Sequence, residues 1–153
     1  NQADMQAGGK GNGVGWGAYQ ACQQGGAIIA TGHEHPYSRT RTLTDLGNSE
    51  AGHGVVGKED EMVVGPGSTF AFVSGLAGKS KRDYDANAHE DDTWWATIYT
   101  SDYFLQNGAV INNYSHDYGA LFITFNVDGN PSKARGVFKT TEGDIIDEFT
   151  ITR

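Results

Sequence analysis

One short motif constrains this chain more than any other feature: the sequence Gly-His-Glu-His at residues 32–35. It follows the apolar stretch Gly-Ala-Ile-Ile-Ala-Thr at residues 26–31. Such a stretch, bounded by glycines, is typical of a fully buried strand in a parallel or mixed sheet. In an extended segment His33 and His35 would project to the same side, because side chains alternate along a strand. Two imidazoles at the carboxyl end of such a strand form half of a transition-metal site.

The residues around this pair add information, since a His-x-His pair alone is a weak signal. Residues 30–40 read Ala-Thr-Gly-His-Glu-His-Pro-Tyr-Ser-Arg-Thr. This stretch closely resembles the last metal-binding motif of the calcineurin-like metallophosphoesterases. It is most similar to the purple acid phosphatase branch, in which a strand ends in Gly-His-x-His followed by Tyr and Arg-Thr. The resemblance implies that His33 and His35 are metal ligands, one for each ion of a two-metal centre.

The same resemblance extends over most of the chain and is strongest at residues 26–40, 67–78 and 118–152. It implies that residues 1–153 are the C-terminal portion of a metallophosphoesterase domain. In that portion, residues 1–40 would hold the closing helix, strand and metal motif, and residues 67–152 a β-rich remainder. The implied fold class is α/β, the α+β portion of a four-layer αββα sandwich. We therefore expect mostly β-strands with one N-terminal helix.

The resemblance also implies a chemistry, the hydrolysis of phosphate mono- or diesters by a hydroxide that two metal ions activate. Iron, zinc or manganese would suit a mixed set of imidazole and carboxylate ligands. The ions would also supply the positive charge that phosphate needs in an acidic chain, whose formal net charge is −8. Tyr37 and Arg39 are expected to lock the motif's loop, while Lys79, Lys81 and Arg82 either help to hold a phosphate or form a solvated turn.

The family's other metal motifs do not precede residues 32–35. They are an Asp-x-His, a Gly-Asp with a bridging aspartate, a Gly-Asn-His and a further histidine. Two ligands cannot hold a two-metal centre, so we expect activity only when the N-terminal part of the same enzyme completes the site. The alternative is a non-catalytic structural or binding protein that retains the scaffold and assembles with other chains, a homo-oligomer included. A carbohydrate-binding module has only Trp94 and Trp95 in its favour.

Net charge, apolar runs and cysteine count limit the kinds of binding partner and the cellular location that we expect. A charge of −8 argues against nucleic acid or an anionic membrane surface as partner, and the longest apolar runs are too short to span a membrane. Cys22 is the only cysteine, so no internal disulfide can form. We expect a secreted or cell-surface protein. Asn113 lies in the only Asn-x-Ser/Thr sequon, on a predicted exposed loop, and would be glycosylated if a eukaryotic cell secretes the chain.

The patterns along the chain predict its elements. A helix should start at Trp16 and stop at Gly25-Gly26. Around Phe149 and Ile151 the alternation of apolar and polar residues is poor, as at a half-covered sheet edge. His53 is expected on a loop within reach of the metal motif. Strands are expected at residues 69–74, 94–99, 120–127, 134–140 and 145–152. Residues 1–15 are expected to form a flexible loop. Residues 39–65 are polar, and the acidic run at 59–61 within them is most simply a solvated loop. Residues 83–92 are interpreted as an exposed loop, with a peripheral cation site as the alternative.

Overall fold

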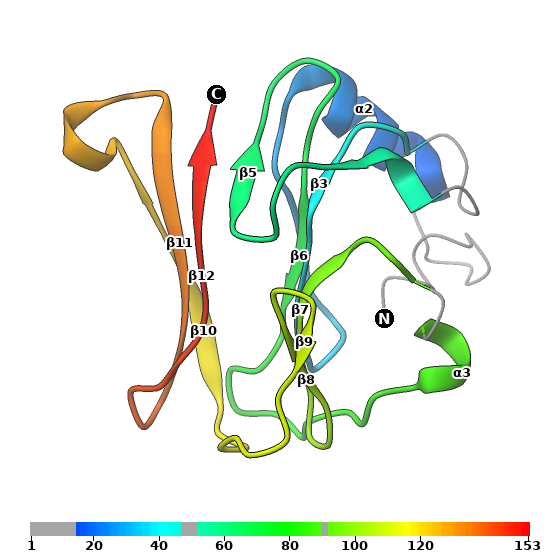
Figure 1. The fold of residues 1–153 in the computed structure, drawn as a ribbon, viewed down its shortest axis with the longest axis vertical. Helices are drawn as coiled ribbons and strands as arrows, with labels where there is room; N and C mark the ends of the chain where they lie inside the picture. The colour runs from blue at the N-terminus through cyan, green and yellow to red at the C-terminus, as the bar shows by residue number, and fades with distance from the viewer. Residues whose placement is uncertain (1–14, 47–51, 90–91) are drawn as a thin grey trace.

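A computed structural model describes residues 15–46, 52–89 and 92–153 of the chain (Figure 1). Its two larger sheets pack face to face, and helix α2 lies on the other side of the first of them (Figure 1). The six-stranded sheet has the order β1-β6-β2-β7-β8-β9, the four-stranded sheet the order β10-β11-β12-β5, and β3 pairs with β4. Both larger sheets mix parallel and antiparallel pairs, which confirms the predicted α/β class.

The described elements have the following bounds. The helices are α2 (Gly15–Gly25), α3 (Ala86–His89) and the short 3-10 turns η1 (Gly52–Gly54) and η2 (Val127–Gly129). The strands are β1 (Ile29–Thr31), β2 (Tyr37–Thr40), β3 (Thr42–Leu43), β4 (Val55–Val56), β5 (Glu61–Val63), β6 (Ala71–Ser74), β7 (Trp95–Tyr99), β8 (Phe104–Gln106), β9 (Ala109–Val110), β10 (Gly119–Phe125), β11 (Lys133–Thr140) and β12 (Ile145–Thr152). No helix in these ranges is long and apolar enough to cross a membrane.

Helix α2 ends where the sequence predicts. Gly26, the residue after it, has a φ of 67°, and a Cβ there would lie 2.6 Å from the backbone carbon of Gly65. Only glycine fits such a helix end. Tyr19 is buried against the six-stranded sheet, and Cys22 is half-buried beside it.

Strand β1 differs from its prediction in two ways. It pairs in parallel with β6, as expected for a mixed sheet, but it is the edge strand of the described sheet and Ala30 is exposed. The chain then bends at residues 33–36, and His33 has a φ of 75°. The expectation that residues 33–35 are extended is therefore wrong, and strand alternation gives no reason to place the two histidines on the same side. Gly75 packs directly against this bend, because a Cβ there would lie 1.7 Å from the backbone oxygen of Glu34.

Residues 39–65 read only as a polar stretch, and no strand was predicted in them. Half of β2, and all of β3, β4 and β5, fall within this stretch. Thr40 and Thr42 are buried because they hydrogen-bond to backbone: the Thr40 hydroxyl accepts from the Ala71 amide and the Thr42 hydroxyl from the Val63 amide, both at 3.0 Å. Satisfied polar side chains of this kind can lie inside a sheet. The acidic run at 59–61 faces solvent at the start of β5.

The C-terminal meander of β10, β11 and β12 forms as predicted, with its turns at the expected residues. The predicted half-covered edge at Phe149 and Ile151 is wrong. Strand β12 lies between β11 and β5, and both side chains are buried with Met62 and Phe70 between the two sheets. Phe125, at the end of β10, is 64% exposed.

Candidate functional site

The two histidines of the motif differ in their surroundings. His33 is exposed and holds the left-handed backbone conformation that is uncommon for residues other than glycine. His35 is half-buried, and its Nδ1 lies 2.7 Å from the Ser80 carbonyl oxygen. A carbonyl can only accept, so Nδ1 carries the hydrogen and Nε2 of the neutral ring keeps a free lone pair. Metal-ligating histidines are oriented in this way by a hydrogen bond from their other nitrogen.

The described part of the chain holds no group of three or more His, Cys, Asp or Glu side chains placed to hold a metal ion. His33 and His35 offer two imidazole nitrogens at the motif. Their chemistry fits a zinc, iron or manganese ion, since neutral imidazoles suit all three. The assignment of both histidines as ligands stays a prediction.

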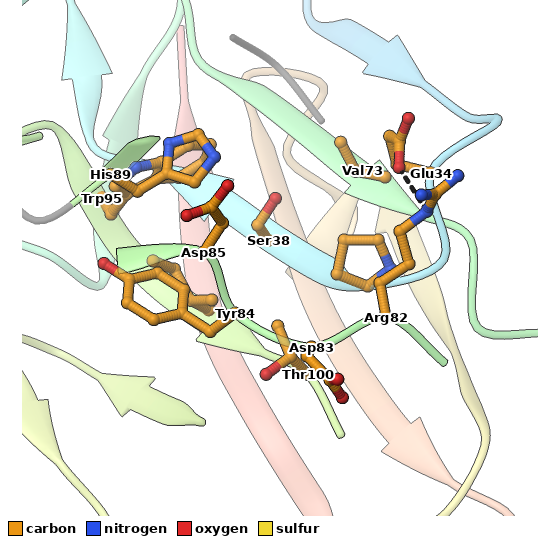
Figure 2. A pocket seen from close by; sticks show the side chains of 12 residues that line it. Glu34, Ser38, Val73, Arg82, Asp83, Tyr84, Asp85, His89, Trp95 and Thr100 are labelled. Carbon is orange, nitrogen blue, oxygen red and sulfur yellow. Dashed lines mark ion pairs between the residues drawn. The ribbon is translucent and has the colours of Figure 1, made fainter. Parts of the chain in front are cut away.

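Glu34, between the two histidines, forms an ion pair with Arg82. Its carboxylate is almost fully buried and lies 2.6 Å from Nε of Arg82 (Figure 2). The Arg82 side chain itself is about half exposed. Together with the hydrogen bond from His35 to Ser80, this ion pair fastens residues 80–82 to the motif at two points.

The basic cluster predicted at residues 79–82 is divided by the fold. Arg82 is committed to Glu34, whereas Lys79 is exposed. The Lys81 ammonium lies 5.6 Å and 5.2 Å from the ring centroids of Tyr99 and Tyr118. Burial lowers the pKa of Lys81, and the charge of Asp117 opposes that shift. The three cations therefore do not form a single phosphate cradle.

Tyr37 and Arg39 point away from the motif into the core between the sheets. The Tyr37 hydroxyl donates to Oδ2 of Asp147 at 2.6 Å, and the Arg39 guanidinium donates to both carboxylate oxygens at 2.6 Å and 2.9 Å. All three side chains are fully buried. Burial and the adjacent Asp147 charge raise the pKa of Tyr37 well above its ordinary value. Arg39 also lies over the ring of Phe149, at 4.1 Å from its centroid. This network holds the strand after the motif to β12.

A cavity of about 210 Å³ opens on the outer face of the six-stranded sheet (Figure 2). Its floor comes from β2, β6 and β7, and its rim comes from the Glu34–Arg82 pair and residues 83–89. Sequence patterns did not predict this pocket, because it joins the motif to residues 83–92, which were interpreted as an exposed loop with a peripheral cation site as the alternative. Its lining residues are Glu34, Pro36, Ser38, Val73, Arg82, Asp83, Tyr84, Asp85, His89, Trp95, Ile98 and Thr100.

Other residues that the sequence singled out lie apart from the motif or in the core. His53 is fully buried, with its ring 4.5 Å from that of Trp94. Trp94 and Trp95 are less than 10% exposed, so they offer no open platform for a sugar. Asn113 is exposed, as a glycosylated residue must be, and its modification stays a prediction. The glycine-rich residues 1–14 lie outside the described part of the chain.

Comparison of the chain with protein-family models, with curated proteins and with solved structures finds no significant match.

Proposed function

We propose that this chain forms one wall of a two-metal phosphoesterase site that hydrolyses phosphate mono- or diesters, with His33 and His35 as metal ligands. The observation that carries the proposal is the hydrogen bond from His35 Nδ1 to the Ser80 carbonyl. It selects the tautomer that a ligand histidine needs and orients the ring. The strained backbone of His33 adds support, since such conformations concentrate at functional sites.

The arrangement of layers supports the family relation that the motif suggests. Helix α2, the six-stranded sheet and the four-stranded sheet follow one another in the order of three layers of an αββα sandwich. The fourth layer would cover the outer face of the four-stranded sheet, where Phe122 is 60% exposed. The outer edge of β1 has no strand partner among the described residues. We propose that strands from the N-terminal part of the same enzyme pair there and bring the remaining ligands.

In this proposal each described group has a distinct task. Bound zinc, iron or manganese ions would supply Lewis-acid chemistry at the phosphoryl group and lower the pKa of water. His33 and His35 would each donate one nitrogen to an ion. The Ser80 carbonyl fixes the His35 ring, and the Glu34–Arg82 pair holds the bend between the two histidines. Arg39 and Tyr37 act only through the position of β2, because both are fully buried.

The test is the metal content of the complete protein carrying His33→Ala or His35→Ala. Loss of an outer hydrogen-bond partner of a ligand typically costs 10–100-fold in metal affinity. Loss of a ligand should therefore cost at least about 100-fold and should lower metal content and hydrolysis of nitrophenyl phosphate together. His116→Ala is the matched control, since His116 is an exposed histidine outside the motif. Normal metal content in both motif variants, measured by elemental analysis, would refute the assignment.

The same experiment separates the enzyme from the alternative of a non-catalytic scaffold that assembles with other chains. A scaffold would be purified without stoichiometric metal and would not hydrolyse the ester, and the two alanine variants would then match the wild type. Under the enzyme proposal, activity of the wild type disappears on chelation and returns when metal is restored.

A further inference from the structure

The pocket beside the motif has on its floor a polar side chain without a partner among the described residues. Ser38 on β2 is 6% exposed and lines the pocket floor. Its hydroxyl makes no hydrogen bond with any residue that the structure describes, and it points into the cavity (Figure 2). The hydroxyl is therefore open to the cavity and can donate a hydrogen bond to a ligand there or accept one from it.

Two further acceptors lie on the same side of the pocket. Asp85 on the rim forms no ion pair or hydrogen bond within the described ranges, and its carboxylate lies between Ser38 and His89 in Figure 2. His89 Nδ1 lies 2.9 Å from Oδ2 of Asp92, which also accepts from the Trp95 indole at 3.1 Å. Because that carboxylate oxygen accepts, Nδ1 of the neutral ring carries the hydrogen and Nε2 can accept.

The charge of the described lining residues disfavours an anionic ligand. Arg82 is the only lysine or arginine among them, and Glu34 neutralises it at 2.6 Å. Asp83 and Asp85 then give the lining a net negative charge. Asp83 accepts a hydrogen bond from the Ser101 hydroxyl, whereas the Asp85 carboxylate has no partner among the described residues. Beside these groups, Val73 and Ile98 give the floor an apolar surface.

We propose that this pocket binds a small organic cation, a primary alkylammonium group with a short apolar body. The three N–H bonds of such an ammonium match three acceptors: the Asp85 carboxylate, the Ser38 hydroxyl and Nε2 of His89. The apolar body would lie on Val73 and Ile98, with the Tyr84 ring at the rim. The Tyr84 ring is held in place by stacking on Tyr103, at a centroid distance of 4.1 Å. The proposal does not depend on the phosphoesterase function, because no metal contributes to this pocket.

The experiment compares three probes of similar size and different charge: n-butylamine, 1-butanol and butyrate. Each is titrated into the protein labelled with ¹⁵N, and the indole N–H signal of Trp95, which lines the pocket, reports binding. Butylamine should shift this signal in a saturable way at neutral pH, and the neutral and anionic probes should not. Asp85→Asn should weaken butylamine binding about tenfold or more, because the ammonium group loses its charged hydrogen-bond partner, the Asp85 carboxylate. Ser38→Ala should weaken it several-fold.

Asp128→Asn is the matched control. Asp128 is an exposed aspartate in the turn between β10 and β11, and its substitution removes the same charge at a position far along the chain from Asp85. It should bind butylamine like the wild type. Asp85 is itself exposed and without partners in the described ranges, so its variant should fold normally. Equal responses to all three probes would overturn the proposal. Unchanged butylamine binding in both Asp85→Asn and Ser38→Ala would also overturn it, whatever the metal content of the protein.

Discussion

Replacing Asp147 by asparagine tests whether the strand after the motif depends on a buried ion pair. The side chain of Asp147 is fully buried and accepts three hydrogen bonds, two from the Arg39 guanidinium and one from the Tyr37 hydroxyl. Asparagine keeps the shape but removes the negative charge, and its amide nitrogen cannot accept. Arg39 would then remain buried and charged without a counterion, which is the costly case for a buried pair.

The size of the effect follows from that geometry. Removing one partner of a buried ion pair destabilises a protein by about 3–5 kcal/mol. Asparagine retains one acceptor oxygen, so we expect a loss near 3 kcal/mol, a large part of a total stability of roughly 5–15 kcal/mol. In a chain of this size each kcal/mol corresponds to about 2–4 °C in the melting temperature. Asp147→Asn should therefore lower the melting temperature by roughly 6–12 °C.

Glu148, the next residue on β12, provides a matched control. It pairs with Arg135 at 2.7 Å, but both side chains are about half exposed. Exposed pairs contribute roughly 0–1 kcal/mol, so Glu148→Gln should change stability by less than about 1 kcal/mol. Urea unfolding followed by circular dichroism measures both variants. If Asp147→Asn lowers the free energy of unfolding no more than Glu148→Gln does, the buried pair does not hold the two sheets together.

Two further predictions concern the backbone of the motif and the buried tyrosine. Gly75→Ala should destabilise the protein by about 1–3 kcal/mol by overpacking, because the new Cβ meets the Glu34 carbonyl, and it should also weaken metal binding. Gly32→Ala is the control, since a Cβ there meets no atom within 4 Å. It should lower the melting temperature less than Gly75→Ala does. Tyr37→Phe should cost stability at neutral pH. Because the folded-state pKa of Tyr37 is raised from 10.0, its contribution is complete below pH 10 and is lost as pH rises, so the gap between wild type and variant in urea unfolding should narrow by about 1.4 kcal/mol per pH unit above that value. A gap independent of pH would contradict this reading.

The elements that the sequence predicted best are those with local signals. Helix α2 has a glycine stop at Gly25-Gly26, and the meander of β10 to β12 has turn residues between clear apolar runs. Both kinds of signal lie within a few residues of the element that they define. The strands within residues 39–65 were missed for the opposite reason. Thr40 and Thr42 read only as polar residues, but they are buried because their hydroxyls bond to backbone 31 and 21 residues away in the chain.

The candidate site was predictable only in part for the same reason. His33 and His35 stand in a motif of four residues, so the sequence alone could point to them. The partner of Glu34 is 48 residues further along the chain, and the partner of Arg39 is 108 residues away. No spacing rule connects such pairs. The pocket at Ser38 and Asp85 is likewise formed by strands and a loop that meet only in the folded chain.

The motif is held from both faces of the six-stranded sheet, and this explains how His33 can keep a strained backbone. On the inner side Arg39 joins β2 to Asp147. On the outer side residues 80–82 bind the bend through His35 and Glu34. A left-handed non-glycine residue costs roughly 1–3 kcal/mol and persists only where its surroundings determine it. Contacts on both sides of the sheet meet that condition. If His33 and His35 bind metal as proposed, these contacts lower the ordering cost of that binding, because they hold the bend that carries both side chains.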